Sequence, residues 1–189
     1  SIQGNALVPL MQYAKLAGKS TGLVSTCRIT HATPASFAAN VFDRDLEATI
    51  ADQYLDREID LLMGGGLEYF ITKERNLCSE FKRSGYSFVT DQAGLSNLTD
   101  TRRILGLFAD SHLPYAIDRK NDPAFAQIPS LANMFKAALR PLSENENGFL
   151  LQVEAGRIDH AGHANDPAAI LHEILEFDNC IPIALEFLK

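Results

Sequence analysis

Apolar positions along the chain follow two patterns, one typical of buried strands and one typical of amphipathic helices. Short apolar runs predict strands at 21–26, 59–63, 86–90, 104–109 and 148–153. Helical spacing predicts helices over 5–17, 33–40, around 78–83, over 123–139 and over 167–181, with another that contains Leu46, Ile50 and Tyr54. This interleaving favours an α/β fold with a mostly parallel sheet sandwiched between helices. We expect a single domain over 1–189, with a less regular insert around 74–122.

Capping and helix-breaking residues locate several helix ends. Asn5 is the expected N-cap of the first helix and Gly18 its stop, and the residues expected on its inner face are Leu7, Leu10, Ala14 and Ala17. Thr33 followed by Pro34 predicts the second helix start. A break at Pro129 moves the start of the 123–139 helix to Ser130. Pro182 ends or kinks the last helix, whose expected inner residues are Ile170, Ile174, Phe177 and Ile181.

Composition excludes some classes of function. A net charge of −7 over 189 residues argues against a nucleic-acid-binding surface, although one or two arginines can still bind a phosphate. The sequence contains no apolar run of roughly 18 residues, which a membrane span requires, and no signal peptide is visible. Cys27, Cys78 and Cys180 lie far apart without metal-site spacing, and we expect three free thiols.

The richest cluster of ionisable residues directly follows the predicted strand at 148–153. Glu154 stands at the strand end, and Asp159, His160 and His163 follow in a helical stretch. Asp159 and His163 are four residues apart, so a helical turn places them on one face. A carboxylate with an imidazole suits zinc, and a lone carboxylate such as Glu154 suits magnesium. The alternative is a capped helix start with a solvated histidine.

Other polar residues have structural interpretations beside functional ones. Thr33 fits a helix cap, and Arg44 between two aspartates fits a surface ion pair. The glycines at 64–66 predict a tight turn rather than a phosphate cradle, because the lysine of a P-loop is missing. His172 and Glu173 fit packing or a supporting hydrogen bond, and His112 is expected to face solvent.

Three separated blocks together resemble the alkaline phosphatase family. They are the stretch 21–37 with Arg44 downstream, the stretch 60–66, and Val153-Glu-Ala-Gly-Arg-Ile-Asp-His-Ala-Gly-His163; Leu171-His-Glu173 with Asp178 is also similar. The resemblance runs in order through almost the whole chain.

The resemblance implies a role for each matching residue. Asp159 and His163 match ligands of one catalytic zinc, and Glu154 and Thr33 match ligands of a magnesium ion. Arg44 matches the arginine that binds two phosphate oxygens. His31 and His160 match variable supporting positions beside the magnesium and the phosphate.

For a complete enzyme, the resemblance implies two Zn²⁺, one Mg²⁺ and phosphomonoester hydrolysis through a phosphoserine intermediate. Inorganic phosphate is the implied product, and the implied setting is an exported homodimer, periplasmic or extracellular. The family's nucleophilic Ser, in an Asp-Ser-Ala segment, is absent from these 189 residues, as are several metal ligands, so we expect little turnover from the chain alone. The alternatives are a non-catalytic metal-binding remnant of the fold and a related phosphodiesterase or sulfatase-like hydrolase.

Overall fold

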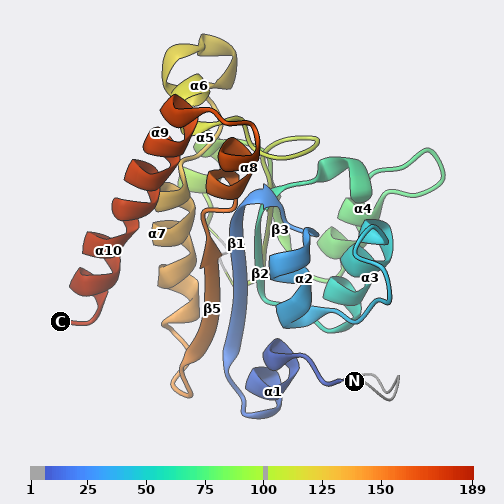
Figure 1. Cartoon of the computed structure of the whole chain (residues 1–189). Coiled ribbons are helices and arrows are strands. Elements are labelled where there is room, and N and C mark those ends of the chain that lie inside the picture. The colour runs from blue at the N-terminus through green and yellow to red at the C-terminus, as the bar shows by residue number, and fades with distance from the viewer. Residues whose placement is uncertain (1–6, 100–101) are drawn as a thin grey trace.

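A five-stranded parallel sheet organises the computed structural model, which describes residues 7–99 and 102–189 (Figure 1). The strand order is β3-β4-β2-β1-β5, and every neighbouring pair is parallel. The strands are β1 (Ser20–Arg28), β2 (Leu61–Gly65), β3 (Ser87–Val89), β4 (Ile104–Leu107) and β5 (Phe149–Glu154). The α/β class predicted from the apolar pattern is confirmed.

Helices cover both faces of the sheet (Figure 1). In chain order they are α1 (Leu10–Leu16), α2 (Ala32–Ala38), α3 (Glu47–Asp56), α4 (Leu77–Arg83), α5 (Gln92–Ser96), α6 (Ala116–Asn121), α7 (Leu131–Leu142), α8 (Arg157–His163), α9 (Pro167–Asp178) and α10 (Cys180–Phe187). Two short 3₁₀ turns, η1 (Leu67–Tyr69) and η2 (Pro123–Phe125), complete the described elements.

Each face of the sheet has its own apolar core. On one face, side chains from α1 to α4 pack with strand residues such as Leu23, Leu62 and Leu105. On the other, residues of α7 such as Met134 pack with Val24. Side chains of a strand alternate between faces, so β1 contributes to both cores and is held between β2 and the edge strand β5.

The first helix is shorter than predicted and turned differently. Asn5 lies outside the described residues, and α1 begins at Leu10. Leu7 and Leu10 are exposed, and Met11 is buried instead, together with the predicted Ala14. Gly18 ends the helix with φ +72°, a conformation that favours glycine.

Three other helix ends test the capping arguments. Ser130 is the N-cap of α7, and its hydroxyl accepts the N–H of Asn133, as the break at Pro129 predicts. Thr33 is not the cap of α2, because the helix begins two residues earlier than predicted, at Ala32, and His31 is the N-cap. Pro182 does not end the last helix; the break falls at Asn179, and Pro182 lies in the first turn of α10, where proline is tolerated.

The last helices expose residues that the pattern predicted to face inward. Ile174, Phe177 and Ile181 are each more than a third exposed, and Ala169, Glu173 and Cys180 are buried instead. β5 was predicted to be a buried strand but lies at a sheet edge and is half-buried throughout. The pattern of apolar residues within one strand does not show whether that strand lies at the edge or in the middle of the sheet.

The remaining expectations concern turns, thiols and membranes. Of the glycines predicted to form a tight turn, Gly64 and Gly65 end β2 instead, and the chain turns at Gly66, which has φ +97°. A Cβ on Gly65 would lie 1.9 Å from the carbonyl oxygen of Ser111. All three cysteines are buried free thiols, as predicted. Across residues 7–99 and 102–189, no helix combines the length and apolar character that a membrane crossing requires. The single domain over 1–189 stays a prediction.

Candidate functional site

Six of the seven site residues inferred from the sequence line one pocket at the carboxyl ends of β1 and β5. The pocket has a volume of about 500 Å³. Its lining includes His31, Thr33, Arg44, Glu154, Asp159 and His160, with Ala32, Ala155, Gly156 and Ile158. Because β1 and β5 are parallel neighbours, the turn into α2 and the turn into α8 leave the sheet side by side.

Glu154 is the last residue of β5, and β1 orients its carboxylate. Ser25 is its register partner on β1, and the Ser25 hydroxyl donates to Oε2 of Glu154 at 2.6 Å. The Ser25 oxygen also accepts the backbone N–H of Cys27 at 2.9 Å, so the buried serine is itself fixed. The carboxylate therefore has a defined position at the pocket wall.

Asp159 and His163 lie on one face of α8, as their spacing predicts. Nε2 of His163 is 3.6 Å from Oδ2 of Asp159, and the two side chains are 81% and 76% exposed. His163 is the inferred site residue that does not line the pocket. The pair is open to solvent, which leaves both ligand atoms accessible to an ion.

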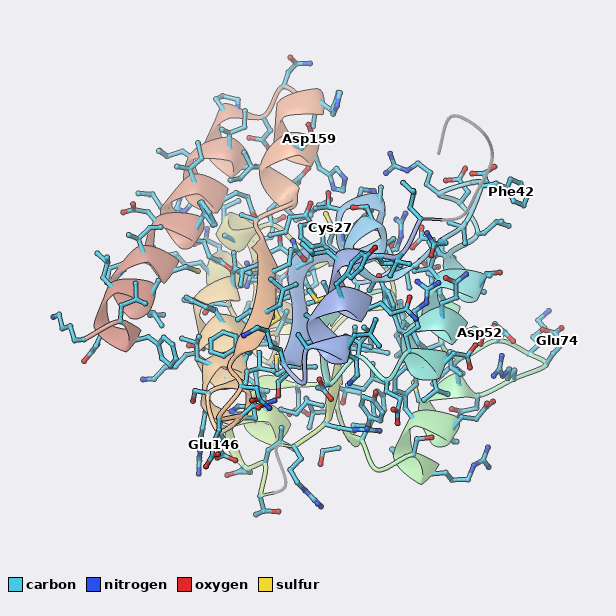
Figure 2. The ribbon with its side chains drawn as sticks, turned by 90° about the horizontal axis from the view of Figure 1, so that it is seen from below. Cys27, Phe42, Asp52, Glu74, Glu146 and Asp159 are labelled. Atoms are coloured by element: carbon cyan, nitrogen blue, oxygen red, sulfur yellow. The ribbon has the colours of Figure 1, made fainter. Side chains whose placement is uncertain are left out.

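Arg44 reaches the pocket from the segment between α2 and α3. Its side chain is exposed, and Nη2 lies 2.8 Å from Nε2 of His31. A guanidinium can only donate, so Nε2 of His31 accepts. His31 thus holds Arg44 at the pocket without neutralising its charge. In the same segment, Phe42 is 96% exposed and projects from the rim of the molecule (Figure 2).

Three histidines meet edge to face at the pocket: His31 and His160, which line it, and His112. Ring centroids lie 5.3 Å apart for His31 and His112, 5.5 Å for His31 and His160, and 4.4 Å for His112 and His160. Burial, followed by nearby arginines, lowers the pKa of His31, and burial followed by Arg157 lowers that of His160. The pKa of His112 is lowered to about 3, first by burial and then by Arg28. The cluster is therefore neutral at pH 7.

His112 was expected to face solvent, and that expectation is wrong. It is half-buried: its Nδ1 accepts the backbone N–H of Arg28 at 3.1 Å, and its Nε2 lies 2.6 Å from Nη1 of Arg28. Arg28 in turn donates from Nε and Nη2 to Oε1 of buried Glu47 at 2.9 and 2.6 Å. No spacing signal marks these residues, because 84 positions separate Arg28 from His112.

Glu173 has the supporting role that was one interpretation of it. Its buried carboxylate accepts the backbone N–H of Ala116 at 2.7 Å and so ties α9 to the start of α6. Burial, as the largest cause, raises its pKa. Cys27 was missed as a site residue: it lies beneath the pocket, with Sγ 4.0 Å from Nδ1 of His160.

Comparison with known proteins connects this chain to one family. The family model described as alkaline phosphatase matches residues 1–189. The chain is 42% identical over 192 residues to alkaline phosphatase 3 of Bacillus subtilis, covering 98% of the chain and 40% of that protein. It is 40% identical to the repressible alkaline phosphatase of Saccharomyces cerevisiae, with 94% and 36% covered, and 30% identical to the alkaline phosphatase of Escherichia coli, with 95% and 48% covered. The chain thus spans less than half the length of these relatives.

Solved structures have the same fold. The alkaline phosphatase of Thermus thermophilus superposes with a TM-score of 0.92 at 43% identity, covering 98% of this chain and 39% of that one. The cold-active enzyme of a Shewanella species gives 0.89 at 36% identity, covering 100% and 45%. From the family match over its whole length, the chain belongs to the alkaline phosphatase family.

Proposed function

We propose that this chain supplies part of the active site of a metal-dependent phosphomonoester hydrolase. The observation that carries the proposal is the pocket that Thr33, Arg44, Glu154 and Asp159 line together. More than 100 residues separate the first two from the last two, so their meeting is not a consequence of sequence proximity. One cation and two carboxylates around a solvent-open space suit an anion bound between a guanidinium and metal ions.

The donor atoms fit the metals that the family resemblance implies. Glu154 is oriented by Ser25, and the exposed Thr33 hydroxyl makes no capping hydrogen bond, so both offer the oxygen ligands that Mg²⁺ prefers. Asp159 and His163 offer an oxygen and a nitrogen from one helix face, which suits Zn²⁺. A variant of the alkaline phosphatase from the Antarctic bacterium TAB5 has been solved with magnesium bound.

The residues of this chain would bind and orient rather than attack. The planar fork of Arg44 is matched to two oxygens of a phosphoryl group, and His31 holds that fork at the pocket. Bound zinc and magnesium would supply Lewis-acid stabilisation of charge on the phosphoryl oxygens. Two ligands from Asp159 and His163 are fewer than the three usual for catalytic zinc. We infer that further ligands and the serine nucleophile come from outside these residues.

The test is phosphate affinity in the full-length protein that carries this sequence, loaded with zinc and magnesium. Arg44→Ala removes a charge-assisted, two-pronged contact and should weaken inorganic phosphate binding by roughly tenfold or more in calorimetry. Metal content by mass spectrometry should not change, because Arg44 is not a metal ligand. Arg83→Ala on α4 removes an equally exposed arginine and serves as the matched control.

Two results would count against the proposal. If Arg44→Ala loses zinc or magnesium, the arginine supports the metals and not the phosphate. If phosphate binds equally well with and without Arg44, the pocket is not the phosphate site. The 189 residues alone should turn over phosphomonoesters poorly, and export and dimerisation stay predictions from the family resemblance.

A further inference from the structure

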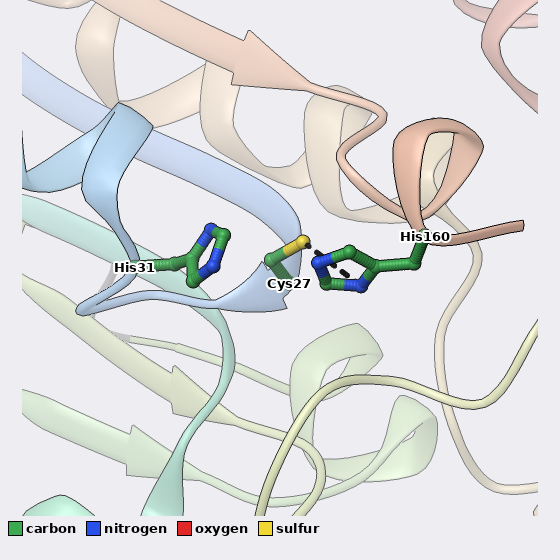
Figure 3. Close-up of side chains that lie close together, drawn as sticks. All are labelled: Cys27, His31 and His160. Carbon is green, nitrogen blue, oxygen red and sulfur yellow. Dashed lines mark hydrogen bonds between the residues drawn. The ribbon is translucent and has the colours of Figure 1, made fainter. Parts of the chain in front are cut away.

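A second group of possible metal ligands combines two residues of the pocket lining, His31 and His160, with the buried Cys27 beneath them. Cys27, His31 and His160 each offer one ligand atom, and these three atoms all lie within 4.8 Å of one another (Figure 3). Cys27 comes from the end of β1, His31 caps α2, and His160 lies on α8. Three segments that are far apart in the sequence therefore converge on one point.

The imidazole nitrogens of this cluster are incompletely paired. Nδ1 of His31 is buried and has no hydrogen-bond partner among the described residues. Nδ1 of His160 lies 4.0 Å from the sulfur of Cys27 and 2.8 Å from Nη1 of Arg157. A buried, unpartnered ring nitrogen is costly, and a metal ion is one of the groups that can satisfy it.

We propose that Cys27, His31 and His160 bind a thiophilic divalent ion of the zinc class, with Zn²⁺ the natural occupant and Cd²⁺ or Co²⁺ as substitutes. A thiolate with two imidazoles suits zinc, and three protein ligands leave a fourth position for water. The ligand set is separate from Thr33 and Glu154 and from Asp159 and His163. The inference does not depend on the proposed phosphatase function.

The geometry requires only a small closure. Bonds of about 2.0–2.3 Å to nitrogen and sulfur place tetrahedral ligands roughly 3.3–3.8 Å apart. The ligand atoms here lie within 4.8 Å, so a contraction of about 1 Å completes the site. His31 and His160 are only half-buried, so this contraction does not have to displace fully buried rings.

Charge and proton balance are compatible with a bound cation. A Cβ built on Gly156 would lie 2.5 Å from the Cys27 sulfur and 3.0 Å from the carboxyl carbon of Glu154, so the two groups are close neighbours. The thiolate offsets one positive charge of a divalent ion, and Arg157, 2.8 Å from Nδ1 of His160, would have to turn away. Burial raises the pKa of Cys27 to about 12, so the thiol keeps its proton without metal and releases it to solvent on binding.

Binding at Nδ1 of His31 would also affect Arg44. In the metal-free protein Nε2 accepts from Arg44, so Nδ1 carries the ring proton. A metal on Nδ1 moves that proton to Nε2, where it faces the guanidinium donor. Arg44 is exposed and can turn away. Occupancy of the cluster would therefore release the arginine that lines the pocket.

Cobalt titration of the full-length protein tests the site directly. Thiolate bound to Co²⁺ gives a near-ultraviolet charge-transfer band, which the oxygen and nitrogen ligands of the other predicted sites cannot produce. We expect this band to rise to saturation during the titration and to disappear in Cys27→Ser. Cys78→Ser removes another buried thiol and should leave the band unchanged. Absence of the band in the wild-type protein, or its survival in Cys27→Ser, would overturn the proposal.

Histidine variants keep the test decisive if Cys27→Ser does not fold. His31→Gln and His160→Gln leave the thiol in place, and each should weaken cobalt binding, read from the same band, by roughly tenfold or more. Unchanged affinity in both variants would refute the ligand set. Because the band reports sulfur and the calorimetry of Arg44→Ala reports phosphate, either proposal can fail while the other stands.

Discussion

The buried Arg28–Glu47 pair should be essential to the fold beneath the pocket, and replacing Glu47 tests this. Arg28 donates from Nε and Nη2 to Oε1 of Glu47, and the Thr30 hydroxyl donates to Oε2 at 2.5 Å. The two charged side chains are 20% and 4% exposed. They tie the end of β1 to the first turn of α3, and the turn between them continues into His31 and Thr33.

Glu47→Gln keeps the shape but removes the charge that balances Arg28. The arginine is left facing neutral His112 in a poorly solvated position. Breaking a buried pair by removing one partner typically costs about 3–5 kcal/mol. The partial exposure of Arg28 puts the expected loss of unfolding free energy near the lower end, at about 3 kcal/mol.

The chain contains a matched control for the effect of burial. Arg75 also donates from Nε and Nη2 to a glutamate, Glu80, at 2.6 and 2.7 Å, but the side chains are 47% and 28% exposed. Arg75 also keeps Asp52 as a partner. Glu80→Gln should therefore cost far less stability than Glu47→Gln, because solvent screens an exposed pair.

Urea unfolding at pH 7, followed by circular dichroism, measures both variants. The midpoint should fall strongly for Glu47→Gln and hardly at all for Glu80→Gln, with similar slopes. Equal losses in the two variants would refute the reasoning, because burial would then not decide the contribution of the pair.

Two further predictions concern the histidine cluster and the glycines. His112 has a pKa lowered to about 3 in the folded protein and an ordinary value of 6.5 unfolded, so the unfolded state binds more protons between these values. The free energy of unfolding should fall as the pH drops from about 6.5 toward 3. In His112→Asn this fall should be smaller by about 1–2 kcal/mol, after allowance for partial exposure. An unchanged pH profile in the variant would contradict a buried neutral imidazole. Gly65→Ala places a Cβ 1.9 Å from the oxygen of Ser111 and should cost about 3 kcal/mol or more. In Gly162→Ala, on α8, the added Cβ meets nothing within 4 Å, and the change should stabilise the fold by about 0.5 kcal/mol. If both glycine variants shift the thermal midpoint equally, close approach at Gly65 is not the reason for its loss of stability.

The local chemistry of the site was readable in the sequence. The spacing of Asp159 and His163 predicts their common helix face, and Ser130 after Pro129 predicts the start of α7. Glu154 follows an apolar run, so its place at a strand end needs no long-range information. These features depend on backbone geometry within a few residues, which the chain itself specifies.

The tertiary structure decided what those local features contact. The sequence marked Thr33, Arg44, Glu154 and Asp159 separately, but the parallel pairing of β1 with β5 brings them to one pocket. The same pairing gathers Cys27, His31 and His160, and the pairing of β2 with both β1 and β4 brings His112, which follows β4, against Arg28. No period or spacing encodes such contacts, because they follow from strand order and from burial on a shared sheet. The sequence alone therefore determined which groups are present and how each local segment folds, whereas their neighbours, exposure and pKa depend on packing between distant segments.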